Sequence, residues 1–184
     1  TERINEVLER DVNIKEGSVS VGREHGTVEF KNVSFRYPHA SEDELSNISF
    51  KIEKGQTLAI IGATGSGKTT LISLIPRFYD ATEGEVLVDG VNVKNYKFDT
   101  LYDKLGYVTQ KAVLFAGSIR ENVFFGESGA PETDEELSNA IALSQAEEFV
   151  NKLPDGTEHM ISQMGRNVSG GQKQRLSIAR ALSR

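Results

Sequence analysis

Apolar residues alternate with polar residues over positions 27–37, and the alternation slips by one position at Asn32. A period of two places successive side chains on opposite faces of a strand, so this segment predicts a strand, a β-bulge and a further strand. Residues 45–52 predict another strand, which ends at the turn Lys54-Gly55. Strand patterns at 85–88 and 91–93 flank Asp89-Gly90, a strong hairpin signal. Together these patterns predict an antiparallel β layer.

Two short apolar runs, at 57–61 and 105–110, predict buried strands. The second run ends at Gln110, which the prediction places at the carboxyl edge of an α/β sheet, where ligands bind. A glutamine at that edge can orient a water or complete a Mg²⁺ shell. An ordinary loop glutamine is the alternative, and a single glutamine does not separate the two.

Helical spacing follows the Gly-, Pro- and acid-rich loop 127–136, with Thr133 or Asp134 as the expected N-cap. The apolar face continues to a stop at Pro154 and consists of Leu137, Ala140, Ile141, Leu143, Ala146, Phe149, Val150 and Leu153. A helical insertion is therefore predicted. Residues 1–26 are polar, with Ile4, Val7 and Leu8 at helical spacing, and predict a short helix and a linker.

Residues 62–69 match the phosphate-binding pattern GxxxxGK[ST], between a predicted strand and a predicted helix that begins near Lys68. Glycines in such a loop let backbone N–H groups surround a polyphosphate, and the helix start adds positive potential. Lys68 is expected to reach the β- and γ-phosphates, and the Thr69 hydroxyl to coordinate Mg²⁺. A glycine-rich turn without function is the alternative, but the strand and helix context disfavours it. The candidate nucleotide-binding residues are Gly62, Thr64, Gly65, Ser66, Gly67, Lys68, Thr69 and Thr70; Lys68 and Gln110 are the candidate catalytic residues, and Thr69 and Gln110 the candidate Mg²⁺ ligands.

A second anion site is predicted at the start of a helix that runs to Leu182. Ser169 suits the N-cap, and the two glycines that follow lower helix stability without an evident packing reason. Bare glycines at a helix start allow a ligand to approach the backbone. The candidate residues are Ser169, Gly170, Gly171 and Gln172.

Tyr37 ends a predicted strand just before Pro38. A half-buried core aromatic is the commoner role of a strand tyrosine. A stacking platform for a purine ring is the functional alternative, and the sequence alone does not choose between them because stacking leaves no spacing pattern.

The 184 residues, with 38% hydrophobic and 26% charged residues, are typical of an ordinary soluble globular domain. The net charge of −6 argues against nucleic acid as the main partner. The chain has no cysteine, so it has no disulfides and no thiol chemistry, and it has no apolar run long enough to span a membrane.

In this order the motifs resemble the nucleotide-binding domain of ATP-binding cassette (ABC) transporters of the exporter type, which includes multidrug and lipid exporters. Residues 35–38 resemble the aromatic adenine-stacking loop with Tyr37, residues 62–69 the Walker A loop, Gln110 the Q-loop, and residues 168–172 the signature motif. Residues 115–122 are similar to the exporter segment that faces the membrane domain.

The resemblance implies an α/β fold: a P-loop NTPase (RecA-like) core with an antiparallel β subdomain and a helical signature subdomain, the C-terminal part of the core lying outside the chain. Residues 1–26 would be a linker from a preceding transmembrane domain, and 27–184 a partial nucleotide-binding domain. Within it, 27–110 would be the β/P-loop core, 111–168 the helical subdomain and 169–184 the signature helix. Two such domains would bind two Mg-ATP head to tail, the signature residues acting in trans, and drive an attached transmembrane pair at the cytoplasmic face of a membrane, most simply the plasma membrane.

Three departures from the family pattern qualify this expectation. Val168 replaces the usual leucine of the signature, and Ser162-Gln163 stand where exporters commonly have Gly-Glu. The family's Walker B aspartate, catalytic glutamate and switch histidine would follow Arg184. His25, His39 and His159 all precede the signature and cannot replace that histidine. The chain by itself is therefore expected to show at most trace ATPase activity.

The leading function is the ATP-hydrolysing motor domain of an exporter. A degenerate half of a heterodimer, which binds ATP but hardly hydrolyses it, is the alternative, and Ser162-Gln163 fit it. A soluble ABC ATPase acting on nucleic acid or ribosomes is disfavoured by the acidic charge.

Overall fold

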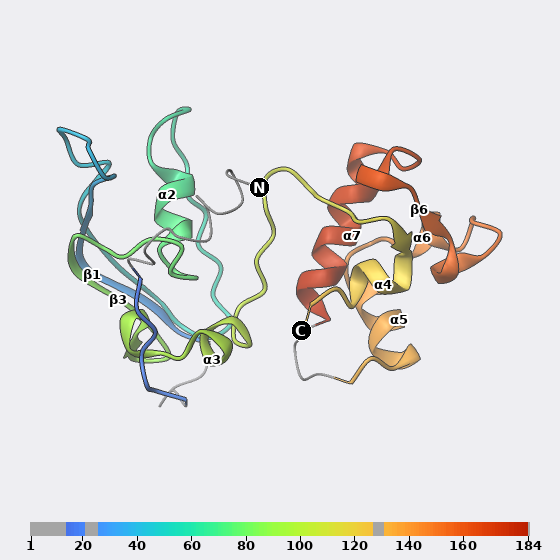
Figure 1. The fold of residues 1–184 in the computed structure, drawn as a ribbon, viewed down its shortest axis with the longest axis horizontal. Coiled ribbons are helices and arrows are strands. Elements are labelled where there is room, and N and C mark those ends of the chain that lie inside the picture. Colours follow the sequence, from blue (N-terminus) through green and yellow to red (C-terminus); the bar gives the residue numbers. More distant parts are fainter. Residues whose placement is uncertain (1–13, 21–25, 127–130, 184) are drawn as a thin grey trace, which may run out of the picture. The chain divides into compact units, whose positions relative to one another are not determined.

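The computed structural model describes residues 14–20, 26–126 and 131–183 (Figure 1). The chain forms two compact units, residues 1–104 and residues 105–184. The helix predicted around Ile4, Val7 and Leu8 lies outside the described residues.

A four-stranded antiparallel sheet forms the N-terminal unit, with the order β2-β1-β3-β4 (Figure 1). The strands are β1 (Val28–Phe35), β2 (Leu45–Ile52), β3 (Glu83–Val88) and β4 (Val91–Asn92). Phe30 of β1 lies opposite Phe50 of β2, and their rings stack with centroids 4.6 Å apart. The predicted antiparallel layer is confirmed.

Two local predictions in this sheet are confirmed by backbone geometry. The register of β1 with β2 shifts between Phe30 and Val33, and Asn32 between them has a φ of 48°. Asp89 and Gly90 join β3 to β4 with φ values of 51° and 74°. Positive φ at both central positions defines the hairpin turn whose twist matches that of the strands.

The described part of this unit also contains the short helical segments α2 (Lys68–Ser73), a 3₁₀ turn η1 (Val93–Asn95) and α3 (Phe98–Tyr102). The fully buried Tyr96 lies between the last two, and its hydroxyl donates to the carbonyl of Val88 at 2.9 Å. Leu74, Val86 and Leu101 are buried in the same unit. Helix α2 begins at Lys68, as the sequence predicts.

The strand predicted at 57–61 is wrong: these residues are irregular, and Ile61 is 94% exposed. A parallel-type strand needs neighbours that bond its backbone on both sides and cover both of its faces. Among the described residues, no strand pairs with this segment. The apolar run alone does not make it a strand.

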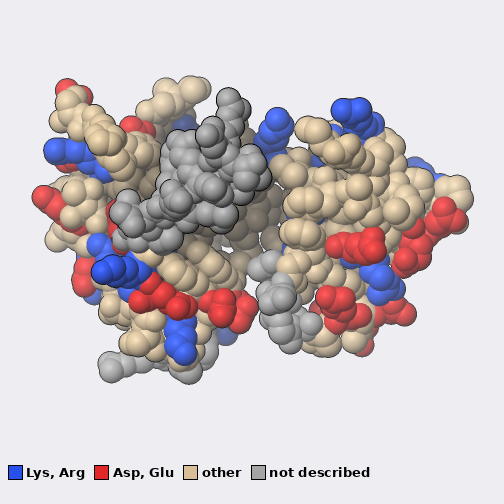
Figure 2. Space-filling view, viewed as in Figure 1, with Lys and Arg blue, Asp and Glu red and all other residues tan. Residues whose placement is uncertain are grey.

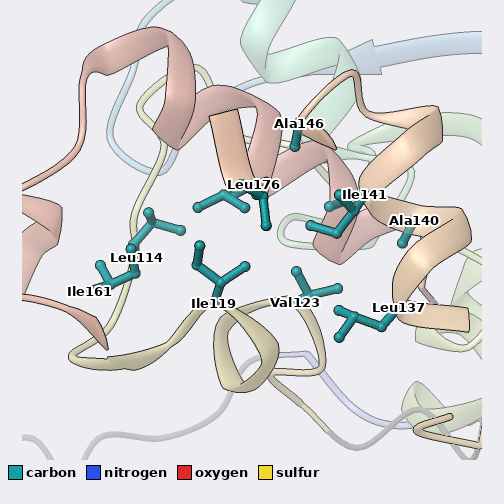
Figure 3. Packing of buried hydrophobic residues seen from close by; sticks show 11 residues of the cluster. Leu114, Ile119, Val123, Leu137, Ala140, Ile141, Ala146, Ile161 and Leu176 are labelled. Atoms are coloured by element: carbon teal, nitrogen blue, oxygen red, sulfur yellow. The ribbon is translucent and has the colours of Figure 1, made fainter. Parts of the chain in front are cut away.

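The C-terminal unit is mainly helical. It contains β5 (Gly117–Ser118), α4 (Ile119–Val123), α5 (Asp134–Leu143), α6 (Glu147–Val150), a 3₁₀ turn η2 (Gly156–Glu158), β6 (Met160–Ile161), a 3₁₀ turn η3 (Gln163–Gly165) and α7 (Gly170–Leu182). Ile119, Ile141 and Leu176 come from three helices of one buried cluster (Figure 3). Other members are Leu114, Val123, Leu137, Ala140, Ala146, Val150, Ile161 and Ala179.

The predicted helical insertion is present, and Thr133 caps α5 by accepting a hydrogen bond from the Glu136 amide at 3.2 Å. The predicted apolar face is divided between α5 and α6 because Gln145 adopts a φ of 58°, which ends the first helix. The buried strand predicted at 105–110 is wrong for the same reason as 57–61: the segment is irregular, and no described strand pairs with it.

Charged side chains of both signs are mixed on the surface. On the face shown in Figure 2, Lys and Arg are scattered among Asp and Glu. This agrees with the acidic balance of the sequence, 27 acidic against 21 basic residues. None of the described helices has the length and apolar character needed to cross a membrane.

Candidate functional site

The loop 62–67 closes around the side chain of Lys68. The Lys68 ammonium donates to the carbonyl oxygens of Gly62 at 2.7 Å and Ala63 at 2.6 Å, and to the Ser66 hydroxyl at 3.2 Å. These three bonds hold a positive charge at the centre of the loop. An anion bound by the loop backbone would meet that charge directly.

Gly67 is required by its backbone and by its neighbours. Its φ of 78° lies in the left-handed region, and a Cβ at this position would lie 2.8 Å from Cδ2 of Leu45. Any other residue would be strained by this φ, and its Cβ would displace the side chain of Leu45 at the start of β2. The loop and the first turn of α2 are therefore packed directly against the sheet.

The two threonines after Lys68 have different environments. Thr69 is exposed, and no described residue bonds its hydroxyl, which leaves it available to a ligand. Thr70 is buried, and its hydroxyl lies 2.8 Å from the Tyr37 hydroxyl. The side chain of Thr70 thus contacts the aromatic residue, and its contribution to a bound nucleotide would come from its backbone.

Tyr37 is half-buried in an aromatic cluster. Its ring meets Phe35 at a centroid distance of 4.8 Å and an angle of 83°, and Tyr79 at 5.3 Å and 85°. Both contacts are edge-type, and no described ring stacks parallel on Tyr37. The hydroxyl bond to Thr70 orients the ring beside the phosphate loop. The predicted core role of Tyr37 is therefore observed, and stacking on a base stays a prediction.

The start of α7 has the predicted form. The Ser169 hydroxyl accepts from the Gln172 amide at 3.3 Å, and the Gln172 side chain accepts from the Ser169 amide at 2.8 Å, which is a capping box. Gly170 and Gly171 are exposed, and a Cβ at either position would meet nothing within 4 Å. Packing within the described chain gives no reason for the glycines.

Gln110 is exposed in an irregular segment of the C-terminal unit. It therefore does not follow a strand, in contrast to the prediction. Among the described residues, no group of three or more His, Cys, Asp or Glu could hold a metal by itself. The two predicted Mg²⁺ ligands lie in different units, Thr69 in the N-terminal unit and Gln110 in the C-terminal unit. Each carries a side-chain oxygen of the kind that Mg²⁺ accepts beside phosphates and waters.

Two exposed aromatic residues of the C-terminal unit form a stacked pair that the sequence did not reveal. The rings of Phe115 and Phe125 lie 4.1 Å apart at 23°, and the side chains of Phe115 and Phe125 are 43% and 48% exposed. The Arg180 guanidinium, from α7, lies 5.5 Å and 5.4 Å from their centroids. It also donates to the carbonyls of Asn122 at 2.7 Å and Val113 at 3.0 Å. Arg180 thus joins the helix that begins at the signature to this aromatic pair.

An antiparallel sheet, a phosphate loop closed around Lys68 and a second glycine-rich helix start define a nucleotide-binding domain of the P-loop NTPase type. Comparison with known proteins makes this specific: the profile described as "ABC transporter" matches residues 45–184. The chain belongs to the ABC transporter family, and it has the fold of that family's nucleotide-binding domains.

Relatives agree with this assignment. The chain is 44% identical over 183 residues to an uncharacterised ABC transporter ATP-binding protein of Bacillus subtilis, covering 100% of this chain and 32% of the relative. It is 42% identical over 182 residues to an ATP-dependent lipid A-core flippase of Pseudomonas aeruginosa, covering 98% of this chain and 29% of the relative.

A solved structure of a bacterial Atm1-family ABC exporter with ATP bound matches with a TM-score of 0.81 and 32% identity, covering 99% of this chain and 32% of that one. The chain therefore spans about a third of the length of these relatives.

Proposed function

We propose that this chain is the ATP-binding and ATP-hydrolysing motor domain of an ABC exporter, located at the cytoplasmic face of a membrane. The observation that supports this most strongly is the phosphate loop, in which three bonds hold the Lys68 ammonium within the loop and the next residue, Thr69, is exposed. The names of the relatives, which include a multidrug export protein and lipid A-core flippases, support the transport role.

In this proposal Mg-ATP binds with its β- and γ-phosphates in the loop 62–69 and its base on Tyr37. Lys68 would neutralise developing charge on the phosphates, the Thr69 hydroxyl would be a ligand of Mg²⁺, and Gln110 keeps its sequence-based role as a further Mg²⁺ ligand. The metal would supply additional positive charge. Removal of the Lys68 charge would take away the cation that this loop itself supplies.

The signature residues Ser169, Gly170, Gly171 and Gln172 act on the nucleotide of a second domain. The support is the exposure of Ser169, Gly170 and Gly171 and the open space around both glycines. Head-to-tail association of two domains then encloses each nucleotide between one Walker A loop and the partner domain's signature.

The membrane domain contacts the stacked pair of Phe115 and Phe125. Exposed aromatic rings that are fixed in one orientation suit the burial of apolar surface against a partner.

The side chains of Ser162 and Gln163, in place of the usual Gly-Glu, alter the segment before the signature. They favour a second candidate, a degenerate half of a heterodimer that binds ATP but hardly hydrolyses it.

The test is ATP affinity of the purified chain, measured by calorimetry with Mg²⁺. Lys68→Ala is expected to weaken binding by more than about tenfold, since a charge-assisted contact contributes roughly 1.5–3 kcal/mol. Lys152→Ala is the matched control, because Lys152 is an exposed lysine outside the phosphate loop that forms an ion pair with Glu148. Equal affinity of wild type and Lys68→Ala would refute the assigned phosphate loop.

A measurement of phosphate release distinguishes an ATP-hydrolysing motor domain from a degenerate domain that binds ATP but hardly hydrolyses it. An assembled transporter that contains this domain should hydrolyse ATP at this domain's site in a Lys68-dependent manner if the motor proposal holds. We expect at most trace release from the 184-residue chain alone, because its sequence has no apolar strand that ends in paired acids.

A further inference from the structure

Glu44 lies beside the phosphate loop although it is distant from it in sequence. It immediately precedes β2, and its amide donates to the carbonyl of Phe35 at 2.8 Å, which fixes its backbone next to the end of β1. A Cβ at Gly67 would lie 3.2 Å from the Glu44 carbonyl oxygen and 3.5 Å from its Oε1. The carboxylate therefore lies against the first turn of α2.

The Tyr37 hydroxyl contacts the same part of that helix. It bonds Thr70, which is three residues after Gly67, and positions three apart lie on one helix face. The loop 37–44 thus begins with the aromatic ring and ends with the carboxylate. Both lie next to the loop that is proposed to hold the phosphates.

The Glu44 carboxylate has no partner that explains its position. The preceding acid, Asp43, forms an ion pair with Arg36 at 2.8 Å. No described side chain or amide bonds the carboxylate of Glu44, which is exposed. A negative charge beside an anion-binding loop is electrostatically unfavourable for phosphate. The exposed carboxylate is instead available to accept hydrogen bonds from a donor group of a ligand.

The sugar of a nucleotide provides such a group. The ribose connects the base to the phosphates, so with the base on Tyr37 and the phosphates in the loop it must lie between them. Glu44 ends the segment that begins at Tyr37, and its carboxylate lies beside Gly67 of the phosphate loop. An ionised carboxylate only accepts hydrogen bonds, and ribose hydroxyls donate them. Acidic side chains recognise ribose in this way in dinucleotide sites.

We propose that Glu44 accepts a hydrogen bond from a ribose hydroxyl and makes this site selective for ribonucleotides over deoxyribonucleotides. This inference rests on the proposed function, because it needs the nucleotide to occupy the loop and Tyr37. Glu44 acts as a specificity residue and takes no part in the phosphate chemistry.

The experiment compares the affinities of the purified chain for ATP, 2′-deoxy-ATP and 3′-deoxy-ATP, each with Mg²⁺. Wild type should bind ATP about tenfold more tightly than the analogue that lacks the recognised hydroxyl, as expected for a hydrogen bond to a charged group. In Glu44→Ala the ratio should fall to near one, and in Glu44→Gln it should be intermediate because the amide oxygen still accepts. Glu42→Ala, on the same loop, should keep the wild-type ratio.

Three results would overturn the inference. The first is equal binding of all three nucleotides by the wild type, and the second is the wild-type ratio in Glu44→Ala. The third is tighter binding of all three nucleotides by one factor in Glu44→Ala, which would mean that the carboxylate only repels phosphate. In each of these cases Lys68-dependent ATP binding would still uphold the proposed function. Loss of that Lys68 dependence would instead refute the proposed function itself. Thermal unfolding of each variant confirms that affinity is compared between folded proteins.

Discussion

The hydroxyls of Tyr37 and Thr70 lie 2.8 Å apart, so the aromatic residue that follows β1 is bonded to the helix that follows the phosphate loop. The two residues are 33 positions apart in sequence. The bond connects the proposed base platform and the proposed phosphate site through one contact. A change in either residue can therefore affect both the free energy of unfolding and the nucleotide affinity. Substitutions that remove the hydroxyl or the ring separate the two effects.

Tyr37→Phe removes the hydroxyl and keeps the ring. We expect it to lower the free energy of unfolding by about 1 kcal/mol, the usual contribution of a hydrogen bond, and to change ATP affinity little. Tyr37→Ala removes the ring and should weaken ATP binding by about 1–3 kcal/mol, the range for stacking on a base. Tyr37→Trp should retain binding. Denaturant unfolding and calorimetry measure the two quantities, and unchanged ATP affinity in Tyr37→Ala would leave only the core role.

Gly171→Ala should separate stability from function at the start of α7. The site has open space for a methyl group, and alanine favours a helix over glycine, so the substitution should raise the free energy of unfolding by about 0.5 kcal/mol. The same methyl group should hinder approach of a partner domain's nucleotide. We expect ATP-dependent dimerisation, followed by light scattering, to weaken while ATP binding to the monomer is unchanged.

Ser169→Arg tests the same surface with a larger side chain. It should abolish ATP-driven dimers and spare monomer binding, whereas Ser138→Arg, at an exposed serine of α5, should leave dimerisation intact. Normal dimers in Ser169→Arg would contradict the proposed action in trans.

Arg180→Ala should destabilise the C-terminal unit more than a similar substitution on the same helix. Arg180 contacts two aromatic rings and donates to two carbonyl oxygens, and we expect its loss to cost about 2–3 kcal/mol. Arg175 also lies over a ring, that of Phe149 at 5.8 Å, and is exposed. Arg175→Ala should cost only about 0.5 kcal/mol. Denaturant unfolding of both variants gives the comparison, and equal losses would show that Arg180 does not hold the aromatic pair.

Asp89 should make the N-terminal unit sensitive to acid. Burial alone would raise the pKa of its carboxyl, but hydrogen bonds from Lys104 and from the amides of Thr27 and Gly26 outweigh burial and lower the pKa below its ordinary value of 3.8. Because the folded pKa is lower than the unfolded one, the carboxylate stabilises the fold above pH 3.8. This contribution is lost as the pH falls through the folded pKa.

Asp89→Asn provides the measurement. Asparagine tolerates the positive φ of this hairpin position, so the substitution removes the charge and keeps the turn. The wild type should be more stable than the variant at pH 7, and the difference should shrink below about pH 4. A difference in unfolding free energy that is constant from pH 7 to pH 2 would contradict this account.

Features that depend on neighbouring residues were predictable from the sequence. The bulge at Asn32, the turn at Asp89-Gly90 and the cap at Ser169 follow from local backbone preferences, and the phosphate loop from its pattern. The strands at 57–61 and 105–110 were predicted wrongly because a strand exists only with a hydrogen-bonded neighbour, which local sequence does not specify.

Contacts between distant residues had no sequence signal. The proximity of Glu44 to Gly67, the bond between Tyr37 and Thr70 and the ring contacts of Arg180 all join segments that lie far apart in the chain. Neither periodicity nor a motif encodes such pairs, and only the fold brings them together. Candidate residues could therefore be named from sequence, but not the neighbours that orient them.

Because Lys68 already forms hydrogen bonds with its own loop, binding of a nucleotide would exchange one set of acceptors of its ammonium for another. Its ammonium already donates to Gly62, Ala63 and Ser66, so phosphate oxygens must replace acceptors that are present before ATP arrives. On the proposed function, the free energy gained on binding would be the difference between two sets of bonds, with the charge in position before the nucleotide arrives. The same loop acceptors would then take back the ammonium when the product leaves.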